Sequence, residues 1–272
     1  MAYVILSRIT SIDQLYLKEF DPAKIYCSKE AKTEALRLKS IAINKTTTNW
    51  DIEDSDAINI SCLNVRSLVK HVRDIENDVF LNKSQILCLV ETWLTSDLVG
   101  MLENYKYQYF INRRSKGTAI LSKVKPNQTT NLETDFSSII LASFEKFDLI
   151  SVYRFADGGN ISECIRVLVE LINLSSLLKT VIVCGDINID IMSEPHNPFT
   201  AALLSLGFVQ KVTSPTHLLG GLIDHVYVRA GDYHSGIVCD VTLHPLYFSD
   251  HDATSFRLTF QSDQMDCDNL DQ

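Results

Sequence analysis

Short apolar runs, each followed by a polar or ionisable residue, recur along the chain from Ala57 to Phe260. They are rich in Ile, Leu and Val, which is typical of buried β-strands. We predict a hairpin over 139–154 that turns near Glu145–Lys146, and a second hairpin formed by 105–111 and 117–124. The remaining strands are predicted at 58–65, 85–91, 180–186, 222–228, 237–243 and 253–260.

Helical spacing of apolar residues is limited to a few stretches of the same region. It predicts helices over 68–79, 161–178 and 198–206, the last opened by a proline in its first turn. About ten strands with so few helices are too β-rich for a doubly wound parallel sheet. We therefore expect an α/β (α+β) fold with two packed sheets and helices outside them.

The chain divides by composition into three parts. Residues 1–56 contain two helix-like stretches and end in a polar linker, and they carry no motif that indicates a function. Residues 57–260 form the folded domain, and residues 261–272 are expected to be an acidic, disordered tail. The net charge of −9 counts against nucleic-acid binding, because such proteins usually present a basic face.

Several protein classes are excluded by composition. No apolar run approaches the roughly 18 residues that span a bilayer, so no membrane association is expected. The seven cysteines include no CxxC pair, which argues against a disulfide scaffold and a zinc ribbon. Cys62, Cys88 and Cys184 lie in strand-like runs and are predicted to be reduced core residues of an intracellular protein.

One stretch, residues 111–125, is basic and contains no acid. Its cations include Arg113, Arg114 and Lys116. The stretch is either a solvated hairpin, the usual fate of a run of charges, or a ridge that contacts phosphates. Charge alone favours neither interpretation.

The polar residues that follow the apolar runs suggest chemistry. They are Asn64, Glu91, Tyr153, Arg154, Asp186, Asn188, Asp224, His225, Asp250 and His251. Strand ends gather on one rim of a layered fold, and carboxylates gathered there repel one another unless a cation neutralises them. Oxygen ligands suit Mg²⁺, and an adjacent histidine is a candidate base. Each residue alone has an ordinary explanation as a turn or cap, but the set suits metal-assisted hydrolysis of a phosphate ester.

Neighbours in a strand face opposite ways, so only one of Asp224 and His225 can enter this site. We predict that Asp224 enters it and that His225 is structural. The other histidines have no metal-ligand spacing and are predicted to be ordinary surface or core residues. They are His71, His196, His217, His234 and His244.

The order of the motifs is specific. The phrases are N-V-R-S-L (64–68), E-T-W-L (91–94), V-Y-R (152–154), G-D-I-N (185–188), P-T-H…G-G-L-I-D-H-V-Y-V (215–228) and Y-F-S-D-H-D-A (247–253). In order and spacing they resemble the endonuclease/exonuclease/phosphatase superfamily. The residues of these motifs are most similar to those of the apurinic-type endonuclease domain of non-LTR retrotransposons.

The resemblance implies a four-layer α/β/β/α sandwich with the site at one end, a DNA substrate, and Mg²⁺ as cofactor, with Mn²⁺ as the alternative. The residues implied to hold the metal are Asn64, Glu91 and Asp250. Tyr153 is implied to donate to a phosphate oxygen, and Asp186 and Asn188 to orient or activate the attacking water. His251 is implied to contact the scissile phosphate, oriented by Asp224. The residues assigned to DNA binding are Arg113, Arg114, Lys116 and Arg154.

The sequence departs from the family pattern in four places. Arg66 stands where abasic-site repair enzymes carry an acid, which favours a mobile-element nickase over a repair enzyme. Phe155 replaces a frequent proline, Ile187 replaces an aromatic residue, and Gly117 stands where a glycine pair is common. The last three are expected to change packing and groove fit more than chemistry.

The leading hypothesis is a metal-dependent DNA endonuclease, a nickase derived from a retrotransposon. The alternatives are a phosphatase or exoribonuclease of the same superfamily, and an inactive remnant that binds without hydrolysis. No reverse transcriptase segment follows His251, so we expect a stand-alone, domesticated or truncated product that is monomeric. Its expected compartment is the nucleus if it acts on chromosomal DNA, and otherwise the cytoplasm.

Overall fold

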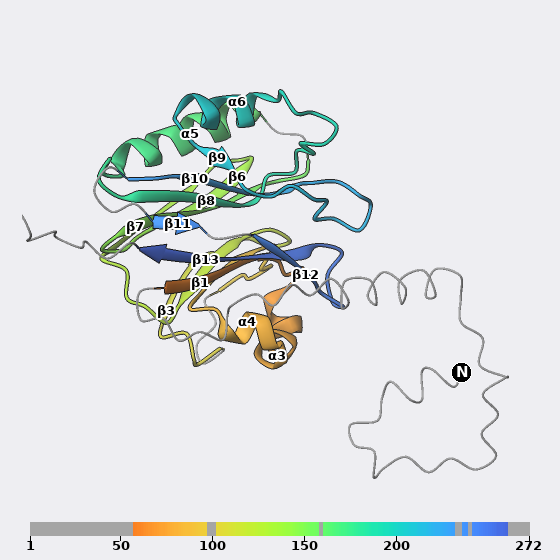
Figure 1. The fold of residues 1–272 in the computed structure, drawn as a ribbon. Coiled ribbons are helices and arrows are strands. Elements are labelled where there is room, and N and C mark those ends of the chain that lie inside the picture. The colour runs from red at the N-terminus through yellow and green to blue at the C-terminus, as the bar shows by residue number, and fades with distance from the viewer. Residues whose placement is uncertain (1–56, 97–101, 158–159, 232–235, 239–240, 261–272) are drawn as a thin grey trace, which may run out of the picture. The chain divides into compact units, whose positions relative to one another are not determined.

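Two mixed β-sheets pack face to face in the computed structural model of the protein (Figure 1). The structure describes residues 57–96, 102–157, 160–231, 236–238 and 241–260. The predicted N-terminal extension and acidic tail lie outside the described residues. No helix among the described residues is long and apolar enough to cross a membrane.

The first sheet has the strand order β11-β13-β1-β2-β4-β3, and β12 also pairs with β13. Its strands are β1 (Ala57–Asn64), β2 (Ile86–Val90), β3 (Tyr107–Ile111), β4 (Thr118–Ser122), β11 (Gly236–Val238), β12 (Thr242–Pro245) and β13 (Asp252–Phe260). Only β1 and β2 run parallel in this sheet, among the described residues. This pair brings the carboxyl end of each strand to the same edge.

The second sheet has the order β5-β6-β7-β8-β10-β9. Its strands are β5 (Gln128–Glu133), β6 (Ser137–Ser143), β7 (Phe147–Arg154), β8 (Thr180–Asp186), β9 (Val209–Gln210) and β10 (Asp224–Arg229). Here β7 and β8 form a parallel pair, so this sheet also gathers the carboxyl ends of two neighbouring strands at one edge.

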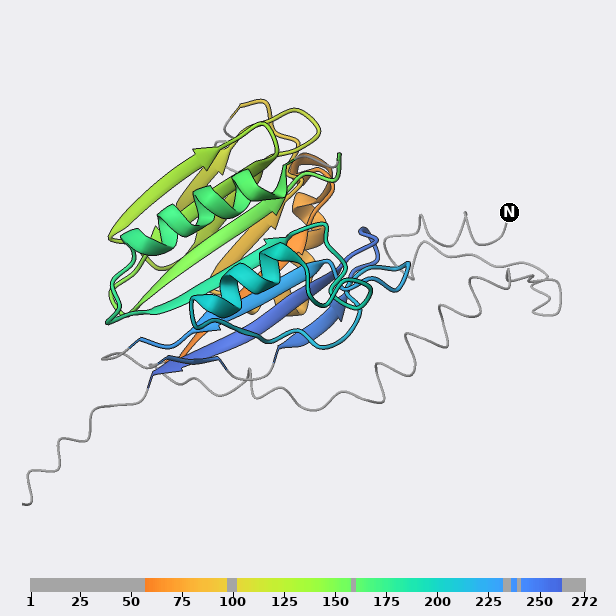
Figure 2. The same ribbon diagram turned by 90° about the horizontal axis from the view of Figure 1, so that it is seen from above.

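Four described helices cover the outer faces. Helices α3 (Leu68–Asn77) and α4 (Val79–Lys83) lie on the first sheet, and α5 (Ile161–Leu174) and α6 (Pro198–Ser205) lie on the second (Figures 1 and 2). The layers are therefore helix, sheet, sheet and helix, and the predicted four-layer sandwich is confirmed. Helix α6 begins at Pro198, as the sequence predicts, and Asn197 is its N-cap.

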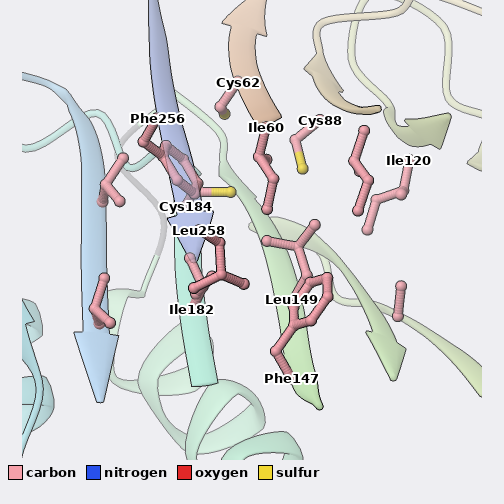
Figure 3. Close-up of a cluster of buried hydrophobic side chains, with 14 of the residues drawn as sticks. Ile60, Cys62, Cys88, Ile120, Phe147, Leu149, Ile182, Cys184, Phe256 and Leu258 are labelled. Carbon is pink, nitrogen blue, oxygen red and sulfur yellow. The ribbon is translucent and has the colours of Figure 1, made fainter. Parts of the chain in front are cut away.

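Alternation along the strands builds the core. Ile60 and Cys62 of β1 face the second sheet, whereas Leu63 packs with Leu68 and Ile75 of α3. The layer between the sheets is formed by side chains from both (Figure 3). Both sides of each central strand are apolar, so alternate residues are buried either between the two sheets or beneath the helices.

The three cysteines Cys62, Cys88 and Cys184 are buried in this inter-sheet layer as free thiols (Figure 3). The prediction that they are reduced core residues is confirmed. Burial and their mutual contacts raise the pKa of the Cys184 thiol well above its usual value, so it is uncharged.

The predicted strand 237–243 is wrong in detail. The described part forms two short strands on the same edge of β13. Val238 is opposite Leu258 and Thr242 is opposite Ser255, and residues 239–240 between the two strands lie outside the described residues.

The predicted helix 161–178 is too long. Helix α5 ends at Leu174, and Ser176 accepts the N–H of Leu178 at 3.1 Å. Serine side chains that bond to the local backbone compete with helix formation, so the apolar Leu178 lies exposed in a turn.

The predicted helix 68–79 is likewise divided at Asp78, whose carboxylate caps α4. Strands β5 and β9 were not predicted, because β5 is largely polar and β9 has two residues.

Candidate active site

The site lies where the parallel pairs of both sheets end. Asn64 is the last residue of β1, and Glu91 directly follows β2. Asp186 is the last residue of β8, and its Cα partners are Tyr153 of β7 and Asp224 of β10. The strand pairings of each sheet thus bring residues far apart in the sequence to one edge.

Asn64 joins the two sheets. Its side-chain amide donates to Glu91 Oε1 at 2.9 Å and to Asp186 Oδ2 at 3.0 Å. Its Nδ2 also lies 3.5 Å from His251 Nε2. Asn64 is completely buried, so the amide is held between carboxylates of both sheets and the imidazole. Four residues predicted for the site are therefore in contact around one side chain.

His251 is oriented by Asp224. The distance from His251 Nδ1 to Asp224 Oδ2 is 2.8 Å, and both side chains are buried. A carboxylate oxygen accepts, so Nδ1 carries the proton and Nε2 faces Asn64. Burial lowers the pKa of His251, but the carboxylates of Asp224, Asp186 and Asp250 outweigh it and raise the pKa to about 9. This is the orientation that the resemblance implies.

Asp186 is buried beside another acid. Burial raises the pKa of Asp186 to about 8, and the carboxylate of Asp224 adds to the shift. Its Oδ1 accepts the N–H of Asn188 at 3.0 Å. Two carboxylates so close favour one shared proton or a cation between them.

Gly185 sets the position of Asp186. It adopts φ +141°, and a Cβ there would collide with the carbonyl oxygen of Val152 on β7. Only glycine allows the parallel neighbour β7 to approach so closely at this point. In the Gly-Asp pair at the end of the strand, the backbone therefore requires the glycine and the chemistry of the site requires the aspartate.

Glu91 and Tyr153 meet across the sheets. The Tyr153 hydroxyl donates to Glu91 Oε1 at 3.1 Å. Burial, together with the charge of Glu91, raises the pKa of Tyr153, so the phenol keeps its proton and acts as a donor. Glu91 has φ +54°, a left-handed conformation that turns its side chain out of the β2 direction.

Asp250 lies at the outer side of the site. Its Oδ2 accepts from Arg66 Nη1 at 2.8 Å and lies 3.7 Å from His217 Nε2. Its Oδ1 is buried and has no hydrogen-bond partner. A buried carboxylate oxygen without a donor is the kind of atom that a cation satisfies.

The residues present fit a divalent cation. Among the described residues, two groups of three side chains have ligand atoms within 4.8 Å of one another, namely Asp186, Asp224 and His251, and His217, Asp250 and His251. The first group offers two carboxylates and one imidazole, and the oxygen Oδ1 of Asp250 is unsatisfied. This donor chemistry matches Mg²⁺ or Mn²⁺ better than a soft metal.

His225 faces away from the site, as predicted. Its Nε2 donates to the carbonyl oxygen of Ile189 at 2.9 Å, and its ring packs against Phe199 and Tyr227. The alternation of the strand therefore separates Asp224 from its neighbour.

His217 corrects the sequence-based prediction. The spacing argument leaves it among the ordinary histidines, but it forms an isolated β-bridge with His251, and the two rings meet edge-on at 4.7 Å. The signal that could have located it is the phrase P-T-H, which stands close before Asp224 in the sequence.

The predicted DNA-binding residues already have protein partners, with one exception. Arg113 Nη1 donates to Glu133 at 2.9 Å, and Lys116 Nζ donates to Asp157 at 2.7 Å. Both cations lie over the ring of Phe155, at 4.8 and 4.0 Å from its centroid. Arg114 is exposed, and no ion pair joins it to a described residue. The basic stretch is thus anchored beside the site rather than freely solvated.

Arg154 and Asn188 hold each other through the backbone. Arg154 Nη1 lies 3.3 Å from the carbonyl oxygens of Ile187 and Asn188, and the Asn188 amide donates to the carbonyl of Arg154 at 2.7 Å. These contacts fix the loop after β8. Both side chains therefore support the site's backbone in addition to any contact with substrate.

Phe155 has a structural reason to differ from proline. It is fully buried, and its N–H donates to the carbonyl of Phe136 at 2.9 Å. Proline has no N–H and could not make this bond. The aromatic ring also supports the basic side chains above it.

Comparison with known proteins agrees with this arrangement. The model of the endonuclease/exonuclease/phosphatase family matches residues 59–251. No curated protein matches the chain significantly.

Several solved structures share the fold. A 3′ phosphatase from Neisseria, bound to a product DNA hairpin, has a TM-score of 0.59 and 17% identity over 75% of this chain and 100% of that one. An AP endonuclease from Archaeoglobus fulgidus has a TM-score of 0.57 and 17% identity, over 75% and 100% of the two chains. The cytolethal distending toxin of Haemophilus ducreyi has a TM-score of 0.54 and 16% identity, over 73% and 97%. Identities this low establish a common fold.

Proposed function

The chain belongs to the endonuclease/exonuclease/phosphatase family, and we propose that it is a metal-dependent DNA endonuclease. The observation that carries the proposal is the contact network of Asn64 with Glu91, Asp186 and His251, extended by the bond from His251 to Asp224. These are the residues that the sequence motifs assign to phosphate-ester hydrolysis, and they come from both sheets.

The proposed reaction is in-line attack of water on a phosphodiester. The water oxygen bonds to phosphorus, and the bond from phosphorus to the 3′ oxygen breaks. The leaving 3′ oxygen takes a proton from solvent, which gives a 3′-hydroxyl and a 5′-phosphate. Asp186 lies on the buried side and accepts a proton from the attacking water. Tyr153 and the protonated ring of His251 donate to the phosphate oxygens, and Asp224 orients the ring by accepting from Nδ1.

Glu91, Asn64 and Asp250 would hold the divalent ion. When bound, it would supply positive charge to the phosphate oxygens as negative charge develops on them. The carboxylates gathered at the edges of the sheets are then compensated rather than mutually repelled.

Exposed apolar side chains near the site support a polynucleotide substrate. They are Trp93, Leu218, Leu219 and Tyr247, with exposed fractions of 38%, 66%, 88% and 81%. Leu218 and Leu219 lie on a loop whose backbone is held by the bonds Leu218 N–Asp250 O and Gly220 N–His217 O, both 2.8 Å. A small phosphate ester offers such side chains nothing, whereas bases and sugars pack against them.

A phosphatase acting on DNA ends is the second candidate. The Neisseria 3′ phosphatase that shares the fold is bound to a DNA hairpin. In addition, Arg113 and Lys116 are already paired with acids, so the predicted phosphate ridge offers less free charge than the sequence suggests.

The similarity of the motifs to non-LTR retrotransposon endonucleases supports the first candidate, internal nicking, and a mobile-element origin, with the nucleus as the compartment.

The test is cleavage of supercoiled plasmid by the purified full chain, with Mg²⁺ and with EDTA. We expect nicking only with Mg²⁺, and a loss of at least 100-fold in His251→Ala and Glu91→Gln. His196→Ala and Glu145→Gln change exposed residues of the same types and are expected to retain activity.

Two outcomes would contradict the proposal, the first its reaction and the second its site. Release of phosphate from a 3′-phosphorylated oligonucleotide without nicking would favour the phosphatase. Nicking that survives in both site variants would mean that another site, or a contaminant, carries the activity.

A further inference from the structure

Two overlapping groups of side chains raise the question of how many ions this site takes. The inner group is Asp186, Asp224 and His251, and all three side chains are buried. The outer group is His217, Asp250 and His251. His251 belongs to both, and its Nδ1 is occupied by Asp224, so it has only Nε2 to offer.

The outer group already contains a cation. Arg66 Nη1 donates to Asp250 Oδ2 at 2.8 Å, and the same oxygen lies 3.7 Å from His217 Nε2. An ion bound between His217 and this oxygen would have to displace the guanidinium or share the oxygen with it. Asp250 keeps only Oδ1, which is buried and without a donor, for a cation on the inner side.

His217 also presents a donor rather than a lone pair. The N–H of Leu219 donates to His217 Nδ1 at 3.1 Å, so Nδ1 is unprotonated and the proton of the neutral ring is on Nε2. Nε2 is the atom that faces Asp250. In this tautomer His217 can ligate a metal through Nε2 only if its proton moves to Nδ1 and the bond from Leu219 breaks, so the tautomer disfavours an outer ion while Arg66 occupies Asp250.

The backbone holds Arg66 at this position. Arg66 has φ +44°, its N–H donates to Asn64 Oδ1 at 3.3 Å, and the next N–H, of Ser67, donates to the carbonyl of Glu91 at 2.8 Å. The turn that orients Asn64 therefore also aims the guanidinium at Asp250. A left-handed residue in a turn bonded to two site residues is a costly arrangement, which indicates a specific role.

We propose that Arg66 takes the place of a second divalent ion, so that the chain binds a single ion, the one assigned to Glu91, Asn64 and the unpartnered Oδ1 of Asp250. The guanidinium supplies a fixed positive charge at Asp250, and its other N–H groups remain donors for a phosphate oxygen. Arg66 is thus a positioning residue for Asp250 and sets the number of ions. The inference rests on the proposed hydrolase function for the meaning of the ion, but its test does not require activity.

The test is the number of Mn²⁺ ions bound by the full chain, measured by isothermal titration calorimetry and by electron paramagnetic resonance. We expect one ion in the wild type and one in Arg66→Lys, which keeps the charge. Arg66→Gln, which keeps a long side chain but no charge, is expected to bind two, with a coupled Mn²⁺–Mn²⁺ signal. Arg166→Gln removes an exposed arginine on α5 and is the matched control, expected to bind one.

The outcomes separate the two proposals. Two ions in the wild type, or one in a folded Arg66→Gln, would overturn the role of Arg66 and leave the metal-dependent function standing. No ion in any variant would instead contradict the metal-dependent function itself. Two ions in the wild type would overturn the proposal even if Arg66→Gln does not fold, and in that case Arg66→Met, also long and uncharged, replaces Arg66→Gln with the same expectation of two ions.

Discussion

Single side chains with several partners define this site. Asn64 contacts acids of both sheets, and Asp224 fixes the tautomer of His251. Replacing either residue leaves a buried charge or donor unsatisfied, which costs about 1–3 kcal/mol in addition to any loss of chemistry. His225 follows Asp224 and is equally buried, but it packs in the core instead of entering the site. Its structural role can be measured through the pH dependence of the free energy of unfolding.

His225 makes the free energy of unfolding depend on pH. Burial lowers the pKa of His225 from 6.5 to about 4. Between these values the unfolded chain binds a proton that the folded chain does not, so stability is complete above pH 6.5 and falls as the pH drops toward 4. The loss attributable to this residue is about 3 kcal/mol. Urea unfolding of wild type and His225→Gln between pH 4 and 8 measures it.

We expect the difference in unfolding free energy between wild type and His225→Gln to change across this window and to be constant above pH 7. Gln can still donate to the carbonyl of Ile189 but does not titrate. A difference that does not vary with pH would show that His225 is charged or exposed in the folded protein.

At the level of elements, two parallel strand pairs, one in each sheet, position Asn64, Glu91, Tyr153 and Asp186 at their ends. The β7–β8 pair depends on Gly185, because no side chain fits against the Val152 carbonyl. The end of β8 is therefore constrained by backbone contact, and the position of Asp186 follows from it.

Gly185→Ala is expected to destabilise the protein by about 3 kcal/mol or more, because the new Cβ forces the strands apart. Gly220→Ala is the matched control: Gly220 also has a positive φ, of +90°, but a Cβ there meets nothing within 4 Å. The control should lose only about 1–2 kcal/mol, the cost of the left-handed conformation alone. Equal losses in urea unfolding would argue against the close strand contact.

The loop that bridges to His251 is expected to select polymeric substrates. The double variant Leu218→Ser/Leu219→Ser should raise the KM for plasmid about tenfold, because base or sugar packing is worth about 1–3 kcal/mol. Hydrolysis of bis(p-nitrophenyl) phosphate should be unchanged. Leu177→Ser/Leu178→Ser, an equally exposed pair in the turn after α5, serves as control. A parallel loss on both substrates would mean that the loop supports catalysis rather than substrate choice.

At the level of the whole molecule, the site joins the edges of two sheets that are otherwise connected through the apolar layer between them. Carboxylates from both sheets meet at this junction, and their repulsion works against the packing. A bound cation would therefore stabilise the fold as well as the reaction.

The melting temperature is expected to rise with Mg²⁺. At a free ion concentration ten times Kd the gain is about 1.4 kcal/mol, which corresponds to a shift of about 3–6 °C for a domain of this size. The shift should disappear with EDTA and in Glu91→Gln, and persist in Glu145→Gln, whose residue lies in the β6–β7 turn. A wild type that melts at the same temperature with and without Mg²⁺ would contradict binding at the site. Scanning calorimetry provides the measurement.

Much of the fold was predictable, because apolar runs indicate where the strands lie and which of their side chains face the core. The hairpin of β6 and β7, the pairing of β3 with β4, and the burial of Cys62 and Cys184 all follow from short-range pattern. Strand β5 does not, because its residues are largely polar and are held by pairing to β6 rather than by their own apolar content.

The sequence alone indicates the polar residues that end four buried strands, since polar residues can follow an apolar run only where the strand leaves the core. They are Asn64, Glu91, Tyr153 and Asp186. The prediction was wrong for Asp224 and His251, because Asp224 begins β10 and His251 directly precedes β13, and both reach the site because these strands run antiparallel to their neighbours. Tertiary structure alone decided the partners of the side chains on the loops. It placed His217 against His251, Arg66 on Asp250, and Arg113 and Lys116 over Phe155. Strand periodicity extends to the last paired residue, whereas a loop side chain finds its partner only when separate segments meet in three dimensions.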